Sequence, residues 1–405
     1  FCQTNRFVFP RNLSVDKTTG LPSMPTPTFQ VPTSFSELED ESSGDGAFRV
    51  LDPPMLDVND GPALQRMLEG SQRKPHNPTP TRTAARATAA RMVSPTNRIV
   101  NMPVEGGFVG MVDREVFDEW LRARAERSGA TRARGTFLRI DRDAEGDAIV
   151  QFEDKNTHQA VKVRTRMVLG ADGARSEVAR QAIEGGREVP FVYAYHEILR
   201  TPATAPAKYD GSRCDVYYQG ELSPDFYAWI FPHGDTISAG AGTAHKGFSI
   251  RNAVGALRRS AGLGGAEVIR REGAPIPLKP LRRWDNGRDV LLCGDAAGVV
   301  APASGEGIYY AMACGRMSAR ALDRCLRTGN AHALRAARRE FMSAHGRVFW
   351  VLGLLQRFWY TNDKRRERFV KMCRDPDVQR LTWESYMHKR LVRRQPLASA
   401  CAAYP

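Results

Sequence analysis

Small residues gathered around a carboxylate are the part of this sequence best suited to hold a ligand. One group follows a buried apolar run that ends at residue 293, and a second opens the next predicted helix. The first comprises Gly294, Asp295, Ala296 and Gly298, and the second comprises Pro302, Gly305, Glu306 and Gly307. A carboxylate such as Asp295 can accept hydrogen bonds from a sugar-like polyol. The free amides at a helix start favour anionic or electron-rich ligand atoms.

A similar corner lies earlier in the chain. Asp172 and Gly173 follow the apolar run 167–171 and precede a predicted helix that starts near residue 176. Small residues let the backbone approach a ligand closely, and the Asp172 side chain can cap the helix that follows. Either corner alone could be an ordinary turn between a strand and a helix. Two of them in this order favour one ligand held between them.

Together these corners resemble those of the para-hydroxybenzoate-hydroxylase-like FAD flavoproteins. The resemblance implies FAD-binding roles for Arg114, Asp172, Gly173, Gly294, Asp295, Ala296, Gly298, Pro302, Gly305, Glu306 and Gly307. Asp295 would hold the ribityl chain, and Arg114 would contact the flavin nucleotide. The loop 302–307 would line the isoalloxazine ring, and the helix start would stabilise negative charge on the reduced flavin.

Four longer segments narrow this resemblance. The segments 90–125, YAYHEIL, YAWIFP and GDAAGVVAPASGEGIYYAM resemble the geranylgeranyl reductases, particularly their bacteriochlorophyll branch, over about residues 85 to 395. The resemblance implies that Tyr227, Trp229, Phe231 and Pro232 shape an apolar substrate channel near the flavin. Aromatic rings suit an isoprenoid chain. Tyr227, Trp229 and Phe231 also alternate at period two, so they can equally form one face of a strand packed on the core.

The activity that this resemblance implies is reduction of a geranylgeranyl side chain. FAD would accept hydride from NADPH, and the geranylgeranyl tail of (bacterio)chlorophyll, or geranylgeranyl diphosphate, would be hydrogenated to phytyl. The sequence does not identify the proton donor. Two alternatives stay open: an FAD-dependent aromatic monooxygenase on the same scaffold, and a non-catalytic remnant that binds pigment or a partner protein.

The first 84 residues do not match this family. They are rich in proline, serine and threonine, a composition that predicts disorder. The family opens with a βαβ unit whose GxGxxG loop cradles the FAD pyrophosphate. Gly44-Asp45-Gly46 lacks a third glycine, a preceding apolar strand and a following helix. We therefore expect the first βαβ unit to be missing or replaced, which puts FAD affinity in question.

The predicted fold is α/β, with a discontinuous Rossmann-like FAD-binding domain at 85–182 and 286–340. A β-rich substrate domain is expected at 183–285 and a helical region at 341–405. The local patterns predict a helix that begins after Asp113 and ends before Gly129. They also predict buried strands at 167–171 and 288–293, helices at 250–262 and 306–326, and mostly helix from 331 to 395.

Net charge and cysteine usage argue against several kinds of partner and site. The net charge is +14, but no nucleic-acid-binding pattern accompanies it, so we expect no nucleic-acid partner. Seven cysteines without a CxxC pair, and histidines without ligand spacing, predict no disulfide framework and no metal site. A cytoplasmic protein without a membrane span is therefore expected. The aromatic and basic run 347–372 could contact a photosynthetic membrane peripherally, although Leu354 and Leu355 are predicted to pack on the core.

Overall fold

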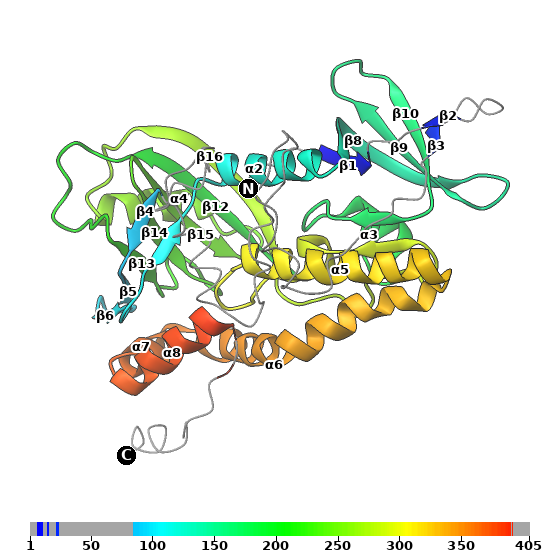
Figure 1. Cartoon of the computed structure of the whole chain (residues 1–405). Coiled ribbons are helices and arrows are strands. Elements are labelled where there is room, and N and C mark those ends of the chain that lie inside the picture. Colours follow the sequence, from blue (N-terminus) through cyan, green and yellow to red (C-terminus); the bar gives the residue numbers. More distant parts are fainter. Residues whose placement is uncertain (1–5, 11–13, 16–21, 24–83, 390, 392–405) are drawn as a thin grey trace, which may run out of the picture.

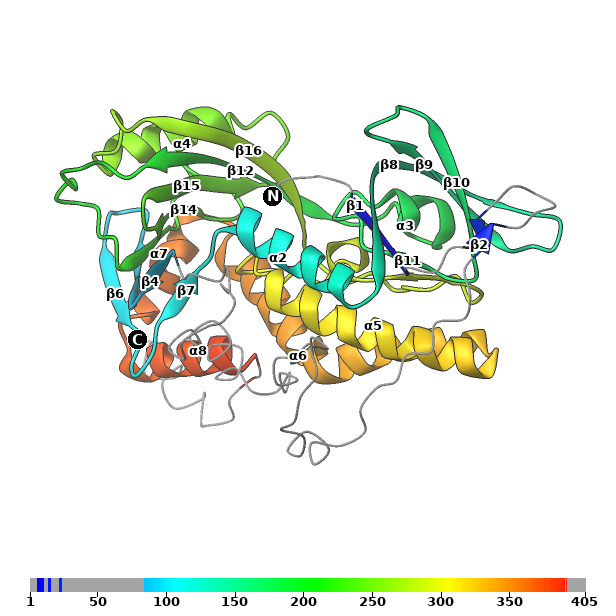
Figure 2. The same cartoon turned by 45° about the horizontal axis from the view of Figure 1, so that its top comes forward.

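The computed structural model describes residues 6–10, 14–15, 22–23, 84–389 and 391. Two β-rich parts lie next to each other, and helix α2 (Arg114–Arg127) lies between them (Figure 1). The long helices α5 (Ile308–Thr328) and α6 (Arg335–Trp359) run together from the junction of these parts along the underside of the smaller one (Figure 2). The site described below is built where these elements meet.

The larger part is a seven-stranded sheet with the order β16-β12-β15-β14-β13-β5-β6. Its strands are β5 (Ala89–Val93), β6 (Ile99–Pro103), β12 (Phe191–Arg200), β13 (Arg213–Tyr217), β14 (Ala228–His233), β15 (Thr236–Thr243) and β16 (Val268–Pro277). Because β5 pairs with β13 in parallel, residues 89–103 lie in the same sheet as the predicted substrate domain. The sequence analysis had grouped them with the FAD-binding domain, since pairing with so distant a strand leaves no local pattern. A short ladder of β4 (Ala85–Ala87) with β7 (Val109–Met111) lies nearby.

The smaller part contains an antiparallel sheet and a two-stranded parallel sheet. The antiparallel strands are β1 (Arg6–Pro10), β8 (Ala130–Arg142), β9 (Ala148–Asp154) and β10 (Ala160–Thr165). The parallel pair is β11 (Val168–Gly170) and β17 (Val290–Leu292), followed respectively by α3 (Glu177–Ala182) and the 3-10 turn η2 (Gly294–Ala297). The remaining N-terminal strands are β2 (Ser14–Val15) and β3 (Pro22–Ser23). The other residues before 84 lie outside the described residues, and with them the prediction of a missing βαβ unit and most of the segment predicted to be disordered.

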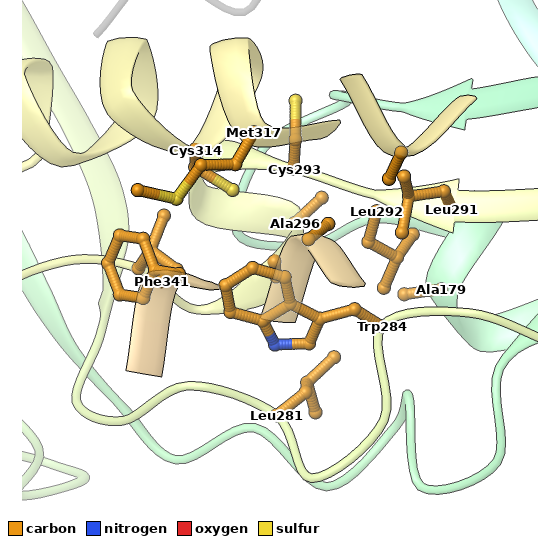
Figure 3. Packing of buried hydrophobic residues seen from close by; sticks show 14 of the residues in the cluster. Ala179, Leu281, Trp284, Leu291, Leu292, Cys293, Ala296, Cys314, Met317 and Phe341 are labelled. Atoms are coloured by element: carbon orange, nitrogen blue, oxygen red, sulfur yellow. The ribbon is translucent and has the colours of Figure 1, made fainter. Parts of the chain in front are cut away.

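The core of the smaller part gathers around Trp284, which is fully buried (Figure 3). Its ring lies 5.4 Å from that of Phe341, and Leu291 and Leu292 of β17 belong to the same cluster as Met317 of α5. Burying each such side chain stabilises the fold by about 1.5–3 kcal/mol. The strand that leads into the Asp295 corner is therefore firmly anchored.

The local helix signals are confirmed. Asp113 caps α2 by accepting a hydrogen bond from the Glu115 amide, and the helix ends two residues before Gly129, whose φ is +96°. Helix α4 (Ile250–Ser260) covers one face of the large sheet. The other C-terminal elements are η3 (Ala331–Leu334), α7 (Asp363–Met372) and α8 (Pro376–His388).

In the C-terminal helices, the structure differs from two expectations, one about a domain boundary and one about a leucine. Helix α6 runs unbroken through residue 340, so the predicted boundary at 340–341 falls within one helix. Leu355 is half-buried, but Leu354 is 53% exposed, so the prediction that Leu354 packs on the core is wrong. A helical turn places neighbouring leucines about 100° apart, so one can face the core while the next faces solvent. Within the described residues, we find no helix both long and apolar enough to span a bilayer.

Candidate active site

The two small-residue corners meet at one edge of the β11–β17 sheet. Gly170 pairs with Leu292, and the Cys293 amide donates a hydrogen bond of 2.9 Å to the Gly170 carbonyl. Because parallel strands end at the same edge, the segments that carry Asp172 and Asp295 leave it next to each other. The structure thus brings the two corners next to each other, as a ligand held between them would require.

The carboxylate of Asp172 holds its corner together. One oxygen accepts the Ser176 hydroxyl at 2.5 Å, and the other accepts the amides of Glu177 at 2.8 Å and Val178 at 3.1 Å. Asp172 thus accepts the first two amides of α3, while the N-cap residue itself is Ser176, whose hydroxyl accepts the Ala179 amide at 2.8 Å. Gly173 has φ +86°, and no described atom lies within 4 Å of the place where a Cβ would stand. A ligand could approach the backbone there.

Asp295 lies in η2, immediately after β17. Its Oδ1 would be 3.4 Å from a Cβ built on Gly307, so it faces the start of α5. Burial raises the pKa of Asp295, while the positive charge of Arg114 acts in the opposite direction. No donor among the described residues hydrogen-bonds to this carboxylate. A half-buried acceptor of this kind fits the hydroxyls of a ribityl chain.

Glycine is required at the end of this turn. Gly298 has φ +76°, and a Cβ there would lie 2.4 Å from the Lys279 carbonyl oxygen. Gly294 also has a positive φ, of +61°, and the Ala296 side chain between them is buried in the Trp284 core. The GDAAG segment is therefore shaped by its backbone conformation and by close packing.

Arg114 begins α2 and forms a two-pronged ion pair with Asp118. Its Nε and Nη2 lie 3.0 and 2.9 Å from the two carboxylate oxygens. The ion pair orients the Arg114 guanidinium at the helix start. From there its positive charge acts on the Asp295 carboxylate and opposes the rise in the pKa of Asp295.

The loop 301–307, which joins the Asp295 turn to α5, is held from several sides. Internally, the Ala301 amide donates to the Glu306 carbonyl and the Gly305 amide to the Ala301 carbonyl, both at 2.9 Å. Externally, the Tyr227 hydroxyl donates to the Ser304 carbonyl, and the Tyr360 hydroxyl donates to that of Ala303 at 3.1 Å. Four carbonyls of the loop thus accept hydrogen bonds from protein donors. The first amides of α5 have no helical acceptor and are available to a ligand.

Pro302 and Gly305 fit closely into this loop. Pro302 Cγ lies 4.0 Å from the place where a Cβ on Gly353 of α6 would stand. Gly305 has φ +67°, and a Cβ there would lie 3.5 Å from the Tyr227 hydroxyl. The predicted cofactor loop therefore packs directly on the predicted substrate box.

An aromatic face of the large sheet adjoins the loop. Tyr227 and Trp229 belong to the cluster on this face, Phe231 packs against it, and Ala228 and Ile230 belong to the cluster under α4. By strand alternation Pro232 lies on the α4 side. The structure therefore brings the three aromatic residues together and places Pro232 on the opposite face.

Two glycines of β15 make room for these rings. Gly240 lies opposite Trp229, and a Cβ on it would be 2.4 Å from the indole. A Cβ on Gly242 would be 2.6 Å from the Phe226 ring. The sequence analysis missed both glycines. The segment SAGAG could have revealed them, because its two glycines stand at every second residue. The aromatic residues of YAWIFP have the same spacing.

A hydrogen-bonded chain fixes Trp229. Its indole N–H donates to Ser238 Oγ at 3.1 Å; His196 Nδ1 lies 2.9 Å from the same oxygen, and His196 Nε2 lies 3.1 Å from Glu272. Burial lowers the pKa of His196, which favours the neutral ring. With the proton on Nε2, facing the carboxylate, Nδ1 accepts the Ser238 hydroxyl. The sequence analysis saw no ligand spacing among the histidines and did not single out His196, because its partners come from other strands.

The chain matches known proteins over most of its length. The family model "FAD binding domain" matches residues 77–345. Geranylgeranyl diphosphate reductase of Rhodobacter capsulatus is 55% identical over 313 residues, covering 77% of this chain and 79% of that protein. The chloroplastic geranylgeranyl diphosphate reductase of Oryza sativa is 36% identical, covering 76% and 69%. The chain belongs to the geranylgeranyl reductase family. It is thus an FAD-binding oxidoreductase by family.

A solved structure supports the fold assigned to this geranylgeranyl reductase family member. A geranylgeranyl bacteriochlorophyll reductase-like protein of Thermoplasma acidophilum superposes with a TM-score of 0.64 at 20% identity, covering 76% of this chain and 82% of that one. The predicted fold class, an FAD-binding domain with a β-rich part and C-terminal helices, is confirmed. No cluster of three or more residues suited to a metal ion occurs in the part of the chain that the structure describes.

Proposed function

We propose that this protein hydrogenates the geranylgeranyl tail of a (bacterio)chlorophyll to phytyl, with FAD as cofactor and NADPH as electron donor. The observation that carries the proposal is the contact of the two predicted sites. The Tyr227 hydroxyl holds the Ser304 carbonyl, so the aromatic face abuts the loop expected to line the flavin ring. Family membership supports the reaction class.

The residues at the two corners fit FAD. Asp295 offers a half-buried carboxylate to the ribityl hydroxyls. Gly307 directly precedes α5, whose first amides have no acceptor within the helix. Gly173 leaves its backbone open to close approach, and Arg114 adds positive charge nearby. When bound, FAD would supply hydride transfer to the alkene.

The aromatic face suits the isoprenoid chain. Tyr227, Trp229 and Phe231 form a row from the loop 301–307 along β14, with successive ring centroids 5.9 and 6.1 Å apart. Burial raises the pKa of the Tyr227 hydroxyl, which therefore stays a neutral donor. Such a row can guide a long apolar chain and exclude water from it. We accordingly assign substrate binding to the seven-stranded sheet, including residues 89–103, and cofactor binding to the β11–β17 edge.

The decisive experiment uses the purified protein, geranylgeranylated bacteriochlorophyll and NADPH under anaerobic conditions. Mass spectrometry should show the pigment gaining two hydrogens for each double bond reduced, and NADH should serve less well. Geranylgeranyl diphosphate, tested in parallel, decides whether the tail is reduced before or after attachment. Bound flavin without any mass gain would contradict the reductase assignment. Stoichiometric oxygen consumption with oxygen insertion would instead indicate a monooxygenase.

A membrane-facing surface would bring the enzyme to its lipophilic substrate. Trp350, Leu354 and Phe358 form a stripe at four-residue spacing on α6 and are 69%, 53% and 46% exposed. The Arg365 guanidinium lies 4.4 Å above the Phe358 ring, and Arg357 is exposed beside it. Aromatic and basic groups together favour the interface of an anionic bilayer. We therefore place the protein in the cytoplasm, peripherally on the photosynthetic membrane.

Vesicle co-flotation tests this surface. The protein should bind vesicles rich in anionic lipid and bind neutral vesicles much less. The triple variant W350S/L354S/F358S should lose about a hundredfold or more in affinity, since each exposed apolar side chain contributes about 1 kcal/mol or more on burial. The matched control is I269S, which alters an exposed apolar residue of β16. Equal binding by the triple variant and by I269S would refute the assignment.

A further inference from the structure

The loop expected to line the flavin ring is fastened by an ion pair with the far end of the described chain. Lys389, which follows α8, places its Nζ 2.6 and 2.7 Å from the two carboxylate oxygens of Glu306. The lysine side chain is 7% exposed and the glutamate side chain 19%. An ion pair so far removed from water is strongly coupled, since little solvent screens it.

Aromatic side chains enclose the ammonium group. Lys389 Nζ lies 3.9 Å from the ring centroid of Tyr386 and 5.5 Å from that of Tyr309 at the start of α5. The nearby charge of Glu306 and burial together raise the pKa of the Tyr386 hydroxyl, so this ring stays neutral. The buried His345 of α6 packs against Tyr309, and burial lowers its pKa. Within this pocket of neutral rings, Lys389 supplies the positive charge that Glu306 faces.

The backbone of Lys389 is itself unusual. Its φ is +52°, in the left-handed region that L residues other than asparagine and aspartate rarely adopt. A glycine or asparagine commonly ends a helix in this conformation. A lysine held there, with its side chain turned inward to Glu306, indicates that the ion pair compensates for the local strain.

We propose that Lys389 is a positioning residue of the cofactor site: it neutralises Glu306 and fixes the loop 301–307 against the flavin ring. The proposal rests on the FAD site assigned above. Without Lys389, Glu306 would stand as an uncompensated carboxylate beside the cofactor. Negative potential there disfavours the addition of electrons, so the flavin reduction potential should fall and FAD should bind less tightly.

Three variants separate charge from shape. K389M removes the charge with a side chain of similar length, K389R keeps the charge, and K389M/E306Q removes both charges together. We expect K389M to weaken FAD binding about tenfold and to lower the two-electron potential by about 30 mV, the equivalent of a tenfold change. K389R and K389M/E306Q should return both quantities most of the way to the wild-type values. K371M, which removes an exposed lysine of α7, is the matched control.

Spectroelectrochemical titration of the holoprotein gives the potential, and fluorescence titration of the apoprotein gives FAD affinity. A wild-type potential in K389M would overturn the proposal, and so would a double variant as impaired as K389M. A parallel cycle of urea unfolding on the apoprotein measures coupling between the two residues without FAD. If the wild type bound no FAD, the proposed function would fail. Additive apoprotein effects would show that no ion pair forms and would overturn the present inference independently.

Discussion

Replacing Gly240 with alanine tests how the aromatic face is built. A Cβ at this position would lie 2.4 Å from Trp229 Cζ2 and 2.6 Å from His196 Cβ, whereas ordinary contacts start at 3.4 Å. The indole would have to move by about 1 Å, and such overpacking costs about 1–3 kcal/mol. The move would also break the hydrogen bond from Trp229 to Ser238, which adds about 0.5–1.5 kcal/mol. We therefore expect G240A to lower the free energy of unfolding by about 2–4 kcal/mol.

Urea unfolding followed by circular dichroism measures this loss, and turnover of the geranylgeranyl substrate should fall with it because Trp229 is displaced. The control is G315A, the same chemical change in the middle of α5, where no described atom lies within 4 Å of the added Cβ. That variant should be stabilised by about 0.5–1 kcal/mol. A G240A protein as stable and active as the wild type would refute the packing argument.

Three further outcomes follow from the same contacts. D172A should destabilise the protein by about 1–2 kcal/mol in urea unfolding, because two amides at the start of α3 lose their acceptor. G298A should yield less folded protein and bind less FAD in a fluorescence titration, since its Cβ meets backbone at a φ of +76°. Burial opposes ionisation of Glu367, but hydrogen bonds from Thr96 and Arg98 outweigh it and lower its pKa to about 2. This carboxylate stabilises the fold above its ordinary pKa of 4.5, and that contribution is lost as the pH falls toward 2. E367Q should therefore lose less stability than the wild type between pH 6 and pH 3, measured by thermal unfolding at about those pH values.

Several features of the site follow from short segments of sequence. The cap of α2 by Asp113, its end before Gly129 and the hydrogen bonds of Asp172 to the first amides of α3 depend on residues within one or two helical turns. The corners at Asp172 and Asp295 each require small residues next to a strand end, and the resemblance carried by GDAAG and YAWIFP pointed to the family. Helix caps and turns are determined locally, so a single sequence can display them.

Other features depend on contacts between distant segments. The pairing of β5 with β13, the position of Gly240 under Trp229 and the chain through Ser238 to His196 are set by strand register, which no short segment encodes. Whether Leu354 faces solvent depends on how α6 packs, and the approach of Lys389 to Glu306 depends on where α8 ends. The sequence by itself determined the local elements, the two small-residue corners and the family. Only the tertiary structure decided which side chains share a face, because packing free energy depends on neighbours brought together by the whole fold.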